Sequence, residues 1–211
     1  TAYVNGMQST GAGACLKHFA ANEQETNRGS ASSAVTERAL REIYLKQFRL
    51  AVRDSSPVSV MSSYNPLNSV YTSISKDLLT GILRDEWNYK GMVMSDWGSA
   101  GAIEDKVNAQ NDVTMPGNGA ADAAVVLAGI KSGRVDREAL DKCCEHILYA
   151  VTQSPTFRGL KMNTKVSFKE HAEVSEKAAC DTMVLLKNEG ALPFSGTTTV
   201  AVFGNGAYNT I

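Results

Sequence analysis

The segment from Gly91 to Gly98 constrains this chain most, because a short apolar run ends abruptly in a carboxylate, an indole and a glycine. Short apolar runs of this kind are typical of buried strands. Two other segments have the same build: Ala14 to Phe19 ends with a basic pair, and Val58 to Asn65 ends in a phenol and an amide. Active sites of parallel α/β proteins form at the carboxyl ends of strands, in barrels and open sheets alike. We therefore expect the carboxyl ends of the three segments to form one site together.

Helical segments alternate with these strands. Apolar residues recur at helical spacing from Thr36 to Arg53 and from Ser75 to Trp87, with Thr36 and Ser75 as N-caps. A weaker strand is predicted at 111–115, followed by helices at about 120–132 and 136–151. This alternation predicts parallel βαβ units and an α/β fold. About four strands are predicted, and a complete eight-stranded barrel takes about 250 residues, so these 211 residues predict half a barrel.

The alternation stops near residue 153. Residues 154–169 lose the periodic pattern and include Pro155 and Gly159, which is typical of a linker. A short helix at about 172–181, an apolar run at 183–186 and a strand at 199–204 are predicted to follow. The predicted divisions are therefore residues 1–153, a linker at 154–169, and the beginning of a further domain at 170–211.

Composition excludes several classes of function. Apolar residues at 43% and charged residues at 20% are typical of a globular protein, and the net charge of −1 leaves no basic patch for nucleic acid. No apolar run approaches the roughly 20 residues of a membrane span. The four cysteines have neither a metal-ligand spacing nor the density of a disulfide scaffold, so we interpret them as buried apolar groups. Thr1 begins no signal-peptide pattern but resembles the middle of a helix, which leaves secretion open, with a cytoplasmic location as the expectation.

Four motifs occur along the chain, and their order and spacing are informative. They are Lys17-His18-Phe19, the run Asn-Glu-Gln-Glu-Thr-Asn-Arg at 22–28, the run Met-Ser-Ser-Tyr-Asn at 61–65, and Ser95-Asp96-Trp97. Together they closely resemble glycoside hydrolase family 3, especially its β-glucosidases. The resemblance covers nearly all of the chain. It implies the C-terminal half of a (β/α)8 TIM-type barrel, a linker, and the first elements of an α/β sandwich domain, which residues 184–193 resemble.

The resemblance implies a retaining glycosidase with Asp96 as the nucleophile that attacks the anomeric carbon. Retention needs a second carboxyl group about 5–5.5 Å away. Family members acting on N-acetylglucosamine have Pro, Gly and His after the Lys-His-Phe triplet and a later Asp-x-His, and neither feature occurs here. The resemblance is therefore to the β-glucosidase branch, in which the acid/base glutamate comes from the second domain and lies beyond Ile211. If that interpretation fails, the candidates within the chain are Glu23, Glu25, Glu37 and Glu104.

Further residues match sugar-binding positions of the family. Lys17 and His18 are implied to donate hydrogen bonds to hydroxyls of the non-reducing glucose. Adjacent residues on a regular strand point to opposite faces, so this requires the backbone to depart from regular geometry there. Arg28 is implied to help hold the sugar, with Glu23 and Glu25 as its alternative, structural partners.

Three residues complete the implied site. Tyr64 matches the tyrosine that donates to the nucleophile and keeps it ionised, or it is a core aromatic whose hydroxyl finds another partner. Met61 and Trp97 form apolar walls against the sugar, or they pack within the protein. The mechanism requires no cofactor and no metal. The expected partners are a β-glucoside or short β-linked oligosaccharide, and the remainder of the polypeptide or a complementing chain, with no nucleic acid and no membrane.

The interpretation is therefore a fragment of a retaining glycoside hydrolase that releases non-reducing terminal β-D-glucose or a related β-sugar. The alternative is a noncatalytic carbohydrate-binding or scaffold protein that keeps the sugar pocket and lacks the second carboxylate. A nucleotide-dependent oxidoreductase is disfavoured because no Gly-x-Gly-x-x-Gly motif follows a strand. Glucose and xylose both stay open, although Trp97 favours glucose by resemblance. We expect the 211 residues alone not to be catalytically competent.

Overall fold

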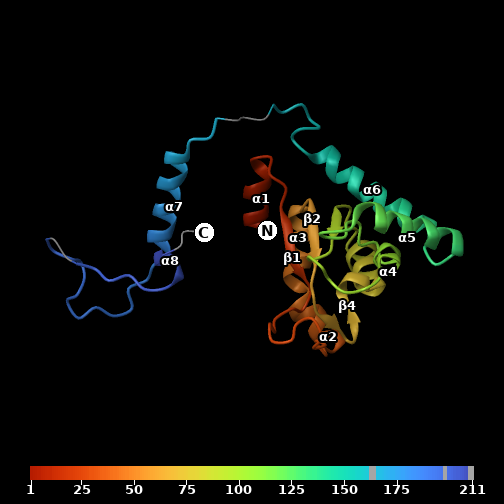
Figure 1. Ribbon diagram of the computed structural model, residues 1–211, viewed down its shortest axis with the longest axis horizontal. Coiled ribbons are helices and arrows are strands. Elements are labelled where there is room, and N and C mark those ends of the chain that lie inside the picture. Colours follow the sequence, from red (N-terminus) through yellow and green to blue (C-terminus); the bar gives the residue numbers. More distant parts are fainter. Residues whose placement is uncertain (162–164, 197–198, 209–211) are drawn as a thin grey trace. The chain divides into compact units, whose positions relative to one another are not determined.

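The computed structural model describes residues 1–161, 165–196 and 199–208 of the chain (Figure 1). These residues fall into two compact units, unit 1 (Thr1–Met162) and unit 2 (Asn163–Ile211). Unit 1 is an α/β structure with a parallel sheet and helices between its strands. This agrees with the fold class that the sequence predicts.

The sheet of unit 1 contains β1 (Cys15–Phe19), β2 (Ser59–Ser62) and β5 (Met92–Met94), paired in the order β1-β2-β5 and all parallel. All three strands lie within the predicted apolar runs. Leu16 is the register partner of Val60, which in turn is the partner of Val93. The three strands therefore point the same way and end at one edge of the sheet, where the predicted site residues follow them.

Helices separate the strands along the chain. The helices of unit 1 are α1 (Ala2–Ser9), α2 (Glu37–Ala39), η1 (Leu40–Tyr44), α3 (Lys46–Ser55), η2 (Thr72–Ile74), η3 (Asp77–Glu86), α4 (Ile103–Asn108), α5 (Gly119–Ser132) and α6 (Arg137–Gln153). Both predicted N-caps are confirmed: Thr36 Oγ1 accepts from the Ala39 amide and Ser75 Oγ from the Leu78 amide, each at 3.3 Å. The segments η1 and η3 are π-helical, which the sequence did not predict.

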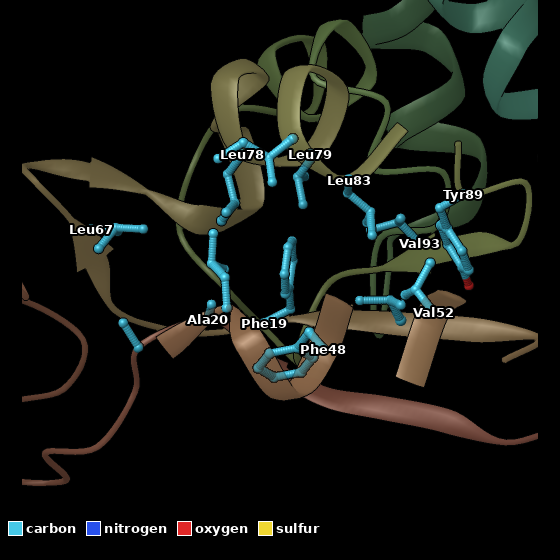
Figure 2. Close-up of a cluster of buried hydrophobic side chains, with 14 of the residues drawn as sticks. Phe19, Ala20, Phe48, Val52, Leu67, Leu78, Leu79, Leu83, Tyr89 and Val93 are labelled. Atoms are coloured by element: carbon cyan, nitrogen blue, oxygen red, sulfur yellow. The ribbon is translucent and has the colours of Figure 1, made fainter. Parts of the chain in front are cut away.

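The main hydrophobic core lies between the sheet and the helices α3 and η3. Figure 2 shows Phe19 beside Phe48 of α3, with Leu78, Leu79 and Leu83 of η3 on the other side. The rings of Phe19 and Phe48 meet edge to face with their centroids 5.1 Å apart. Because Phe19 is the last residue of β1 and fully buried, this core fixes the strand end from which the site is built.

Two local predictions differ from the structure. The predicted strand at 111–115 is reduced to an isolated parallel bridge between Met94 and Val113. Polar side chains take the place of ladder bonds there, since Asp112 Oδ2 accepts from the Val93 amide at 2.6 Å and Ser95 Oγ from the Met115 amide at 2.9 Å. A short hairpin of β3 (Pro66–Leu67) and β4 (Val70–Tyr71) was not predicted.

Unit 2 contains α7 (Phe168–Thr182) and α8 (Asn205–Tyr208). Helix α7 includes the helix predicted at 172–181 and begins four residues earlier. The strand predicted at 199–204 is wrong, because these residues have irregular backbone in the structure. A strand is defined by hydrogen bonds to a neighbouring strand, and among the described residues of unit 2 there is none beside this segment.

Candidate active site

Asp96 lies two residues beyond β5 and is largely buried, with 13% of its side chain exposed. Its Oδ2 atom is 3.4 Å from Nε2 of His18, which belongs to β1. The two residues are 78 positions apart in the sequence, and the parallel sheet brings them together across β2. The expected meeting of the strand ends is therefore observed for this pair.

The end of β1 departs from regular strand geometry at the predicted place. The register of β1 against β2 shifts between Leu16 and Phe19. Adjacent residues here are consequently not restricted to opposite faces of a regular strand. Lys17 and His18 both line a hollow of about 530 Å³ together with Asn22 and Glu23.

Tyr64 and Trp97 join the loops after β2 and β5. The Tyr64 hydroxyl donates to the Trp97 carbonyl oxygen at 2.6 Å, and the carboxylate of Asp96, the expected acceptor, also interacts with this hydroxyl. Burial, and next the negative charge of Asp96, raise the pKa of Tyr64, because both disfavour a phenolate. The phenol therefore remains a neutral donor beside Asp96. The Trp97 side chain is 58% exposed and is available for a ligand to contact.

Arg28 contacts Glu25, one of its two expected structural partners, and also the ring of Tyr64. Its guanidinium carbon lies 4.7 Å from the centre of the Tyr64 ring, a cation–π geometry. Its Nη1 atom donates to Glu25 at 2.6 Å, and Glu25 also accepts from Asn22 at 3.3 Å. Arg28 is thus attached to the Asp96 region through Tyr64, and Glu25 neutralises part of its charge.

Met61 lies in β2 and is the register partner of Met94. Successive side chains of a strand alternate between the two faces of a sheet. Val60 and Val93 belong to the main core, so Met61 and Met94 are on the opposite face, where both are half-buried. That face carries the apolar side chains nearest to the ends of β2 and β5.

Three of the four acids that were reserve candidates for the second carboxylate pair with an arginine. Glu25 pairs with Arg28, and Glu37 pairs with Arg41 on the same helical stretch. Glu104 lies in α4, 3.4 Å from Arg134. Glu23 is exposed at the hollow that Lys17 and His18 line.

The sequence did not indicate how the segment after β5 is attached. Ser95 is fully buried, its amide donates to the Val113 carbonyl at 2.9 Å, and the Gly98 amide donates to the Met115 carbonyl at 2.8 Å. With the Met115 amide bonded to Ser95 Oγ, three hydrogen bonds flank Asp96. The only indication of these hydrogen bonds in the sequence was the strand predicted at 111–115, which places residues 113 and 115 beside β5.

A second hollow of unit 1, with a volume of about 770 Å³, lies away from this site. It is lined by residues 11–13 and 55–58, which precede β1 and β2, and by residues 149–150, 153–155 and 158–160. Segments that precede parallel strands lie at the opposite edge of the sheet from those that follow them. The site residues predicted from the sequence motifs therefore do not line this hollow.

Two further searches cover only the described part of the chain. No group of three or more His, Cys, Asp or Glu side chains is arranged to hold a metal ion. No helix there is both long enough and apolar enough to cross a membrane.

Comparison with known proteins gives consistent matches. The family model "Glycosyl hydrolase family 3 N terminal domain" matches residues 1–149. "Probable beta-glucosidase K" of Aspergillus fumigatus is 39% identical over 202 residues, which is 95% of this chain and 26% of that protein. "Beta-glucosidase B" of Emericella nidulans is 40% identical over 191 residues, 89% of this chain and 23% of that protein.

The solved structure of β-glucosidase 3B from Thermotoga neapolitana in complex with glucose is also similar. It superimposes with a TM-score of 0.83 at 42% identity, over 98% of this chain and 30% of that one. The chain thus spans about a quarter of the length of the curated relatives named above.

Proposed function

The chain belongs to glycosyl hydrolase family 3, and on that basis we propose that it is part of a retaining β-glucosidase-like enzyme. The substrate is a small β-glucoside or short β-linked oligosaccharide, from which non-reducing terminal β-D-glucose or a related β-sugar is released. The observation that carries the proposal is the position of Asp96, just past the end of a parallel strand and 3.4 Å from His18 of another.

In the proposed reaction the Asp96 carboxylate attacks the anomeric carbon and the glycosidic bond breaks. The leaving oxygen takes a proton from the acid/base group, and a glycosyl ester forms on Asp96. Water, deprotonated by the same acid/base group, then attacks the ester, which releases the sugar and regenerates the carboxylate. These steps use no metal and no cofactor.

The acid/base glutamate lies outside this chain in our proposal. The matched relatives are about four times as long, and Glu25, Glu37 and Glu104 are each paired with an arginine. The remainder of the same polypeptide, or a complementing chain, supplies this group.

The proposed architecture follows from the order of the strands. Strands β1, β2 and β5 pair in their chain order, and Val113 continues the series by its bridge to Met94. We assign them to the C-terminal half of a (β/α)8 barrel within residues 1–153, followed by the linker at 154–169. Residues 170–211 then begin an α/β sandwich domain.

The matched polar residues hold the sugar. Lys17 and His18, which line one hollow, donate to hydroxyls of the terminal glucose. Arg28 reaches the same sugar while its guanidinium stays over the Tyr64 ring. Met61 and the exposed Trp97 supply the apolar walls.

The decisive experiment is covalent labelling of the purified gene product that contains this chain. A 2-deoxy-2-fluoroglucoside should inactivate the enzyme and leave a glycosyl ester on Asp96, which peptide mapping locates. Hydrolysis of a panel of nitrophenyl β-glycosides would separate glucose from xylose preference. A label on a different carboxylate would overturn the assignment of Asp96. Sugar binding without any hydrolysis would favour the noncatalytic binding protein instead.

A further inference from the structure

We call residues 96–100 the Asp96 loop. Side chains from three different segments of the chain donate to backbone carbonyls of this loop. Tyr64 donates to the Trp97 carbonyl at 2.6 Å. Lys106 Nζ donates to the Ser99 carbonyl at 2.8 Å. Ser73 Oγ donates to the Ala100 carbonyl at 2.7 Å. The loop is therefore held at three points, by Tyr64 and Ser73 from earlier parts of the chain and by Lys106 from the helix that follows the loop.

Lys106 is the unusual member of this set, because it is only 4% exposed. Burial lowers its pKa, and the more distant charge of Asp122 opposes that effect. A buried ammonium costs several kcal/mol unless other groups compensate it. No carboxylate in the described part of the chain lies within ion-pair distance of Lys106. The hydrogen bond to the Ser99 carbonyl is therefore the contact that compensates for burial of the ammonium group.

The backbone of Ser99 connects Lys106 to the proposed nucleophile, Asp96, through two hydrogen bonds. Its carbonyl accepts from Lys106, and the Ser99 amide donates to the carbonyl of Asp96 at 3.1 Å. Between Asp96 and Ser99, Trp97 has a φ of 35°, in the left-handed region that is unfavourable for a residue with a side chain. A loop with such a residue keeps its shape only where surrounding contacts determine it.

From this geometry we propose that Lys106 is a positioning residue that fixes the Asp96 loop and so aims the Asp96 carboxylate and the Trp97 ring at the sugar. The proposal rests on the proposed function of Asp96. A displacement of about 1 Å at a reacting group can cost roughly a hundredfold in rate. Lys106 therefore acts on the rate of glycosyl-ester formation without touching the substrate.

The test uses the full gene product and three variants. Lys106→Met keeps most of the side-chain volume and removes the donor, and Lys106→Gln restores a neutral donor. The matched control is Lys131→Met, at an exposed lysine of α5. Hydrogen exchange followed by mass spectrometry measures the order of residues 96–101, with β5 as the internal reference. The rate constant of inactivation by a 2-deoxy-2-fluoroglucoside measures ester formation, and the inhibition constant of glucose measures binding.

In Lys106→Met we expect the Asp96 loop to exchange at least tenfold faster while β5 is unchanged, and inactivation to slow about tenfold with less than threefold change in glucose binding. Lys106→Gln should recover part of both losses, and Lys131→Met should match the wild type. Unchanged exchange and inactivation in a folded Lys106→Met protein would overturn the proposal. So would failure of both Lys106 variants to fold, since Lys106 would then support the whole unit. If the wild-type label maps away from Asp96, the proposed function fails, and the exchange result still decides whether Lys106 fixes the loop.

Discussion

Replacing Asp112 should destabilise unit 1 far more than replacing any surface acid. The Asp112 side chain is completely buried, and its Oδ2 accepts from Arg84 Nη2 at 2.7 Å and from the Val93 amide at 2.6 Å. Its Oδ1 is 3.0 Å from Nδ1 of His146 in α6. The carboxylate therefore joins η3, β5 and α6, and the change Asp112→Ala removes all three contacts at once.

The magnitude follows from burial. The Arg84 side chain is 5% exposed, so solvent cannot replace the lost carboxylate, and breaking a buried pair in this way costs about 3–5 kcal/mol. Arg84 also donates to the carbonyls of Tyr89, Gly91 and Gln110. These bonds remain after the substitution, so we expect the lower end of that range, about 3 kcal/mol. A folded domain has only about 5–15 kcal/mol of stability in total.

Urea unfolding followed by tryptophan fluorescence measures this loss. The measurement is made on this 211-residue chain, in which both tryptophans, Trp87 and Trp97, belong to unit 1, so the signal reports that unit. The control is Glu42→Ala, which breaks an exposed pair with Arg38 and should change the free energy of unfolding by at most about 0.5 kcal/mol. A double-mutant cycle with Arg84→Met isolates the coupling. A loss below about 1 kcal/mol in Asp112→Ala, or no coupling to Arg84, would refute the reasoning.

Three other outcomes are expected in the gene product. Asp96→Ala should abolish turnover of nitrophenyl β-glucoside while glucose binding, measured by calorimetry, persists; retained turnover would exclude Asp96 as the nucleophile. Lys17→Ala and Arg28→Ala should each lower kcat/KM about ten- to a hundredfold, since a charged hydrogen bond contributes about 1.5–3 kcal/mol, whereas losses under threefold would assign both residues to structure alone. Because the pKa of Tyr64 is raised in the folded state, its stabilising contribution is complete below the unfolded pKa of about 10 and is lost as pH rises through the folded pKa. The advantage of wild type over Tyr64→Phe in thermal midpoint should therefore be complete at pH 8 and shrink as pH rises above the unfolded pKa of about 10, and a constant difference would show that the phenol's ionisation is not involved.

The sequence predicts the strands well where burial alone determines them. Val60 and Val93 are fully buried at the centre of the runs that end at Ser62 and Met94, and Phe19 is fully buried at the end of β1. That apolar pattern is visible without any structure. The N-caps at Thr36 and Ser75 are also local, since each bonds an amide three residues away. The π-helical winding of η1 and η3 was missed, because it keeps nearly the same apolar stripe as an α-helix.

Prediction from the sequence fails where a polar side chain replaces a backbone contact. Asp112 looks like the polar start of a strand, and only the fold reveals that its carboxylate bonds Val93 and Arg84. Lys106 lies in a short helix whose other charged residues include Glu104 and Asp105, so its pattern is that of a solvated face. Its burial depends on segments that are close only after folding.

The replacement of backbone contacts by polar side chains has one physical consequence for the candidate site. After Met94 the pairing between β5 and the next segment is no longer a regular ladder, because Ser95 bonds through both its amide and its Oγ and the next backbone bond is made by the Gly98 amide. A continuous ladder would carry Asp96 onward as an ordinary strand residue, with its side chain confined to one face of the sheet. Ending the ladder lets the chain turn at Asp96, and the donors at the Trp97, Ser99 and Ala100 carbonyls then hold that turn. Accordingly, a variant that loses one of these donors should lower the rate of ester formation by a larger factor than it lowers the stability of the sheet.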